Sequence, residues 1–162
     1  MRPDLSLTRR QGFIAVGVAA GLGLAAVLAV ALWPSKKPRR VALIGDSLAV
    51  GLAGPLGQLA AQAGVPFKAE GHVGSTVATW LANPSWGSWV PSFSPTITLI
   101  ELGTNSYLDP APNLAQYKQL AAKFPGAVWI HPPAEPSAPM PKVHAVIDEI
   151  GVPTIPELTG LQ

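Results

Sequence analysis

The fold is decided by the stretch Val41-Ala42-Leu43-Ile44-Gly45-Asp46-Ser47-Leu48. Its four apolar residues predict a buried strand, and the glycine that follows them predicts a sharp turn. A serine directly after such a turn lies at the carboxyl edge of a parallel sheet, where the next helix begins. Ser47 is therefore placed where an α/β fold presents a nucleophile.

The rest of the body alternates predicted strands and helices. Apolar, β-branched runs predict strands at residues 41–44, 65–69, 96–102, 127–130 and 152–155. Amphipathic runs predict helices at residues 48–63, 75–81, 113–124 and 142–150, and residues 83–95 are expected to form a loop. We expect Pro55 to disturb the first helix, because proline has no N–H to donate. The order βαβαβαβαβ predicts a three-layer α/β domain with a parallel sheet of about five strands.

Three groups at the predicted strand ends suit the stabilisation of an oxyanion. The backbone N–H of Ser47 lies at a helix start, where negative charge is favoured. Gly74 follows the second strand, and its N–H can approach a substrate closely because no side chain intervenes. Asn105 follows the third strand and carries a side-chain amide. Together they form the donor set that acyl transfer to a serine requires.

These motifs resemble a known family when they are taken in order. Gly45-Asp46-Ser47-Leu48, then Gly74, then Gly103-Thr104-Asn105 are similar to the motifs of the SGNH (GDSL-type) hydrolases, which are esterases and lipases. The resemblance covers Val41 to about Pro156. It implies a flavodoxin-like fold, Ser47 as nucleophile and first oxyanion donor, and Gly74 and Asn105 as further donors. It implies no cofactor and no metal. The expected substrate is an ester, such as an O-acetyl group on a carbohydrate or cell-envelope glycan.

The sequence departs from the family's pattern at the general base. The family's Asp-x-x-His element has no counterpart here, because no acidic residue stands three places before His72, His131 or His144. His131, after the fourth strand, is the histidine whose predicted place best suits the missing base. Since the sequence stops at Gln162, near where that element is expected, we expect a domain truncated at its C-terminus. A catalytically inactive binding or assembly module is therefore the alternative function.

The expected truncation also removes a helix that would cover the sheet. We therefore expect an apolar face near Val41–Ile44 to be open to water, and self-association through that face.

Residues 1–40 form a basic leader that differs from the domain at 41–162. Seven of the 11 basic residues precede Val41, whereas the body has four lysines against eight carboxylates, so the basic balance does not indicate nucleic-acid binding. Residues 13–33 are uncharged and apolar, and as a helix they would span about 30 Å. They predict a membrane anchor with the body outside the cytoplasm, or a signal peptide whose cleavage after Ala31 would release it.

The absence of cysteine and the positions of three tryptophans further limit the kinds of site that we expect. The absence of cysteine excludes disulfides and thiolate metal sites. Trp80, Trp86 and Trp89 cluster after the second predicted strand. They would either line the cleft as an aromatic surface for a sugar or acyl chain, or form a small core that holds the loop in place.

Overall fold

The computed structural model describes residues 39–106, 112–133 and 140–156. Its sheet is all parallel, with strand order β2-β1-β3-β4-β5. The strands are β1 (Val41–Gly45), β2 (Phe67–Gly71), β3 (Ile97–Glu101), β4 (Ala127–Ile130) and β5 (Thr154–Ile155). This is the strand order of flavodoxin-like proteins. The predicted α/β fold with a parallel sheet of five strands is confirmed.

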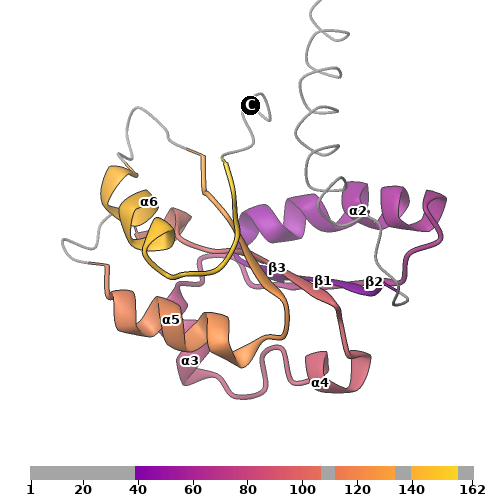
Figure 1. Cartoon of the computed structure of the whole chain (residues 1–162), viewed down its shortest axis with the longest axis horizontal. Coiled ribbons are helices and arrows are strands. Elements are labelled where there is room, and N and C mark those ends of the chain that lie inside the picture. The colour runs from indigo at the N-terminus through magenta and orange to yellow at the C-terminus, as the bar shows by residue number, and fades with distance from the viewer. Residues whose placement is uncertain (1–38, 107–111, 134–139, 157–162) are drawn as a thin grey trace, which may run out of the picture.

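Helices cover both faces of this sheet. In Figure 1, α2 lies on one side of the strands, whereas α3, α4 and α5 lie on the other. The described helices are α2 (Ser47–Gln62), α3 (Val77–Ala82), α4 (Val90–Phe93), α5 (Leu114–Lys123) and α6 (Pro141–Asp148), with a short 3-10 helix η1 (Thr104–Ser106) after β3. The short α4 lies inside the segment that was expected to be a loop.

The alternation of side chains along each strand divides the core into two parts. On β4, Val128 and Ile130 belong to the cluster under α2, whereas Trp129 belongs to the cluster on the other face. That second cluster receives residues from α3, α5 and α6. This division assigns every strand residue to one face of the sheet, and it decides which side chains can approach Ser47.

The expected exposure of Val41–Ile44 is wrong. These four residues are between 0% and 5% exposed. On one face α2 covers the strand, because Ala49, Leu52 and Leu56 pack against Val41 and Leu43. Self-association of the chain stays a prediction, but an open face on β1 no longer supports it.

The expected disturbance at Pro55 is also wrong, since α2 runs through it from Ser47 to Gln62. Pro55 is exposed, so its ring lies on the solvent side of the helix, where water can satisfy the carbonyl that loses its donor.

The predicted membrane segment, residues 13–33, lies outside the described residues. Within the described ranges, no helix combines the length and the apolar character needed to cross a bilayer.

Candidate active site

Ser47 is the first residue of α2 and is exposed. Asp46, the residue before Ser47, caps the helix, since the backbone N–H of Leu48 donates to Oδ1 of Asp46 at 2.9 Å. Asp46 is fully buried. Because Asp46 supplies the cap, the Ser47 hydroxyl is not used for it and makes no hydrogen bond with the other described residues. Ser47 is therefore exposed at a helix start, with a hydroxyl group that no other described residue engages.

The turn after β2 holds Gly74 beside this helix start. The backbone N–H of His72 donates to the carbonyl of Gly45 at 3.0 Å, and that of Ser75 donates to the carbonyl of His72 at 3.0 Å. Gly74 has a φ of 75°, a conformation that a residue with a Cβ rarely adopts. Among the described residues, the backbone N–H groups of Ser47 and Gly74 have no hydrogen-bond partner. Both are therefore available to an incoming oxyanion.

Asn105 connects the ends of three strands. Its Nδ2 donates to Oδ2 of Asp46 at 3.2 Å and to the backbone carbonyl of Ser75 at 3.0 Å. An amide –NH₂ has two hydrogens, and each of these acceptors takes one. The structure thus brings Asn105 to the Ser47 turn and the Gly74 turn, as the sequence predicted, but with its donors already engaged.

Glu101 is a second buried carboxyl group at the site, and the sequence analysis missed it. It ends β3, is 2% exposed and lies on the α2 side of the sheet, next to Asp46. Burial raises the pKa of Glu101 well above its ordinary value, and the charge of Asp46 raises it further. Burial also raises the pKa of Asp46, while the hydrogen bond from the Leu48 backbone opposes that shift. An acidic residue at the end of a buried apolar strand was the sequence signal for this pair.

Gly45 allows the turn to pass close to β3. A Cβ placed on Gly45 would lie 2.0 Å from the carbonyl oxygen of Glu101 and 2.7 Å from the Cβ of Ala49. The backbone N–H of Asp46 donates to that same carbonyl at 3.1 Å. Only glycine therefore lets α2 begin directly above the end of β3.

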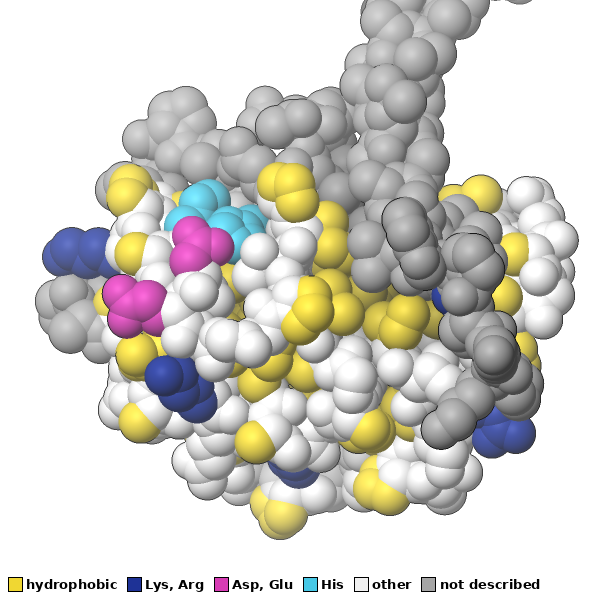
Figure 2. All heavy atoms as spheres, in the orientation of Figure 1, with side chains coloured by type: hydrophobic (Ala, Val, Ile, Leu, Met, Phe, Trp, Pro, Cys, Tyr) yellow, Lys and Arg dark blue, Asp and Glu magenta, His cyan; other side chains and the backbone are white. Residues whose placement is uncertain are grey.

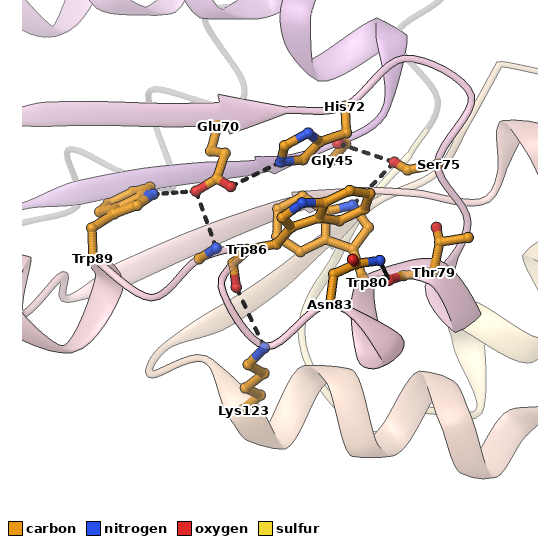
Figure 3. Close-up of polar contacts among 11 residues, drawn as sticks. Gly45, Glu70, His72, Ser75, Thr79, Trp80, Asn83, Trp86, Trp89 and Lys123 are labelled. Atoms are coloured by element: carbon orange, nitrogen blue, oxygen red, sulfur yellow. Dashed lines mark hydrogen bonds and ion pairs between the residues drawn. The ribbon is translucent and has the colours of Figure 1, made fainter.

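His72 does not face the helix that carries Ser47. A Cβ placed on Gly71 would meet the side chain of Val50 and the backbone of Asp46, so Gly71 faces α2. His72, the next residue along the chain, therefore faces the opposite side of the sheet. There, Nε2 of His72 lies 2.8 Å from Oε1 of Glu70, and its ring stacks on Trp86 with centroids 3.8 Å apart (Figure 3).

His131 also faces away from α2. It follows β4 on the same face as Trp129. Its Nε2 lies 3.1 Å from Oδ1 of Asp148 on α6, and its ring centroid lies 4.7 Å from that of His144. Figure 2 shows histidine and acidic side chains side by side at the surface, on the α6 side of the molecule. The structure thus places the predicted base against α6.

The tryptophans after β2 form a small core beneath the edge of the sheet. Trp80 is fully buried and donates from Nε1 to Oγ of Ser75 at 3.1 Å. Trp89 donates to Glu70, which also accepts the backbone N–H of Gly87 at 3.0 Å (Figure 3). Between a cleft-lining aromatic surface and a small core that holds the loop in place, these contacts favour the small core.

Glu70 is the acceptor at the centre of this small core, and sequence reasoning missed it too. Burial alone would raise the pKa of Glu70, but hydrogen bonds from His72, Trp89 and the Gly87 backbone outweigh it and lower the pKa. The signal was its position two residues before His72, which puts both side chains on one face of the strand. Among the described residues, no three histidine, aspartate or glutamate side chains gather closely enough to hold a metal ion.

Several solved esterases and lipases share this fold. A GDSL-like lipase from Bacteroides thetaiotaomicron aligns with a TM-score of 0.54 at 20% identity, over 85% of this chain and 78% of that one. The psychrotrophic esterase EstA from a Pseudoalteromonas species gives 0.55 at 17%, over 73% and 76%. Axe2, an acetyl xylan esterase from Geobacillus stearothermophilus, gives 0.50 at 18%, over 69% and 71%.

The chain therefore has the fold of the GDSL-type, or SGNH, hydrolases, as the resemblance of its motifs predicted. No family model and no curated protein matches the sequence.

Proposed function

We propose that the chain is an ester hydrolase that works through an acyl-enzyme on Ser47. The observation that carries this proposal is an exposed serine hydroxyl at one edge of the sheet, together with two backbone N–H groups, those of Ser47 and Gly74, that have no hydrogen-bond partner among the described residues. Donors placed in advance where charge develops are the largest single source of catalysis in acyl transfer. A serine that served only as a helix cap would not need them.

The proposed reaction has two halves. In the first, Oγ of Ser47 loses its proton to a base and attacks the ester carbonyl, whose oxygen becomes negative and accepts hydrogen bonds from Ser47 N–H and Gly74 N–H. The bond to the alcohol breaks, and the alcohol leaves with a proton. In the second, water attacks the acyl group and frees Ser47. Asn105 joins as third donor by exchanging its bond to the Ser75 carbonyl for one to the oxyanion.

The substrate proposed is an O-acetyl ester of a carbohydrate or a cell-envelope glycan. The acetyl xylan esterase among the solved structures of this fold supports that class. If residues 13–33 anchor the chain with its body outside the cytoplasm, a substrate in the cell envelope lies within its reach. No cofactor enters the proposed reaction.

The second candidate function is a catalytically inactive module that binds an ester or assembles with a partner. It is favoured by the histidines, since His72 is paired with Glu70, and His131 with Asp148, on the face opposite α2. Without a base, catalysis falls by about 10⁴-fold, because the oxyanion hole and binding alone remain.

Hydrolysis of 4-nitrophenyl acetate by the full-length chain distinguishes the two candidates. The enzyme proposal expects turnover that Ser47→Ala abolishes, whereas turnover equal in wild type and Ser47→Ala would contradict it. His131→Gln and His72→Gln then form a matched pair. A loss in the first variant alone supports the predicted role of His131 as the base, and retention in both refutes it.

A further inference from the structure

Two acidic side chains lie buried together at this site, and no described residue places a cation beside them. Asp46 is 0% exposed and Glu101 is 2% exposed. The ion pairs of the described residues involve Glu70 and Asp148 instead. Two neighbouring carboxylates removed from water would repel each other strongly, so the pair must hold a proton.

The contacts show which of the two carboxyl groups stays ionised. Asp46 accepts hydrogen bonds from the Leu48 backbone at 2.9 Å and from Nδ2 of Asn105 at 3.2 Å, and both favour its charged form. Glu101 has the charge of Asp46 beside it, which favours the neutral form. The proton therefore resides on Glu101.

We propose that neutral Glu101 and ionised Asp46 act as one positioning unit: both oxygens of the Glu101 carboxyl group are buried without a hydrogen-bond partner among the described residues, and while that group is neutral the Asp46 carboxylate keeps its place and orients the Asn105 amide and the first turn of α2. This inference rests on the proposed function, because it explains how the donors around Ser47 are held. Glu101 is a positioning residue, since it acts through Asp46 and is itself buried beneath α2.

The proton on Glu101 makes the stability of the folded chain depend on pH. From the turn after β1, Asp46 is the titratable group that faces Glu101; α2 presents the Ala49 backbone N–H, which favours the ionised form. On β4, Ile130 is the register partner of Glu101, and His131 faces the opposite side. The folded chain therefore binds the Glu101 proton more tightly than the unfolded chain does. The contribution of Glu101 to stability is fully present at and below pH 4.5, its ordinary pKa, and falls as the pH rises toward the raised pKa of the folded state.

The test compares wild type, Glu101→Gln and Glu101→Leu in the full-length chain. Glutamine keeps the shape of a neutral carboxyl group without its titration, and leucine removes the polar group. Thermal unfolding is measured by circular dichroism from pH 5 to pH 9. We expect the melting temperature of wild type to fall with rising pH and that of Glu101→Gln to stay nearly level. Equal pH dependence in both chains would overturn the proposal.

A second readout reports on positioning itself. The side-chain amide signals of Asn105 are followed by ¹⁵N NMR and assigned by their loss in Asn105→Asp. In wild type they should shift with pH at the midpoint of the stability change, and in Glu101→Gln they should not. Asn105 signals that do not move with pH in wild type would contradict the unit, and this titration decides alone if Glu101→Leu does not fold.

The rate of labelling by a fluorophosphonate probe connects the unit to the proposed function. We expect labelling of wild type to decline at alkaline pH, where Glu101 ionises beside Asp46, and we expect Glu101→Gln and Glu101→Leu to lose that decline. An unlabelled wild type would refute the enzyme proposal while leaving the unfolding and NMR results to judge the unit. An equal alkaline decline in all three chains would refute the unit alone.

Discussion

Oδ2 of Asp46 accepts a hydrogen bond of 3.2 Å from Nδ2 of Asn105, a residue 59 positions further along the chain. The bond joins the turn after β1 to the 3-10 helix after β3. Because Asn105 also donates to the carbonyl of Ser75, one side chain fixes the relative positions of all three loops that would surround a substrate. The geometry around Ser47 therefore depends on Asp46 as much as on the serine.

Replacing Asp46 with alanine should destabilise the chain. The variant loses the cap of α2 and leaves the Asn105 amide without one of its acceptors, which together cost about 1–3 kcal/mol in the free energy of unfolding. Urea titration measures the loss. Ser47→Ala is the control, since Ser47 is exposed and its variant should stay within about 0.5 kcal/mol of wild type. Equal stability of Asp46→Ala and wild type would show that neither bond matters to folding.

Gly45, which ends β1, and Gly51, which lies within α2, should respond to alanine with opposite signs. In Gly45→Ala the new Cβ would overlap the carbonyl oxygen of Glu101, which should cost about 3 kcal/mol or more. In Gly51→Ala the Cβ meets nothing within 4 Å, so the better helix propensity of alanine should stabilise the chain by about 0.5–1 kcal/mol. Unfolding free energies of the two variants test this directly, and a stable Gly45→Ala chain would contradict the close approach of α2 to β3.

Glu70 should stabilise the fold in a way that depends on pH. Its pKa in the folded chain lies below the ordinary 4.5, so its contribution is present above pH 4.5 and is lost as the pH falls through the folded value. The melting temperature of wild type should therefore exceed that of Glu70→Gln at pH 6 by more than it does at pH 3. A difference that stays constant between these pH values would mean that the bonds from His72, Trp89 and Gly87 do not depend on the charge.

The backbone of the site could be predicted from the sequence because its signals are local. An apolar run followed by Gly45 placed β1, its turn and Ser47, and the same reasoning placed Asn105 after β3. The partner of Asn105 could not be predicted in this way. Which acceptor an amide meets depends on how closely two strand ends approach, and that distance is set by the missing side chain of Gly45.

Other features of the site depend on which face of the sheet a side chain occupies. His131 follows β4, as predicted, but the period of two along the strand turns its ring toward α6. Glu101 and Glu70 were overlooked because a lone acidic residue in an apolar strand carries little information until its neighbours in space are known. The burial of Val41–Ile44 followed from the packing of α2, which the sequence alone did not reveal.

The intact mass of the full-length chain, before and after treatment with a fluorophosphonate probe, tests the central claim most directly. The account predicts a single adduct on wild type and none on Ser47→Ala, whose fold should be unchanged. A folded wild-type chain without an adduct, or an adduct that persists in Ser47→Ala, would contradict the assignment of Ser47 as the nucleophile.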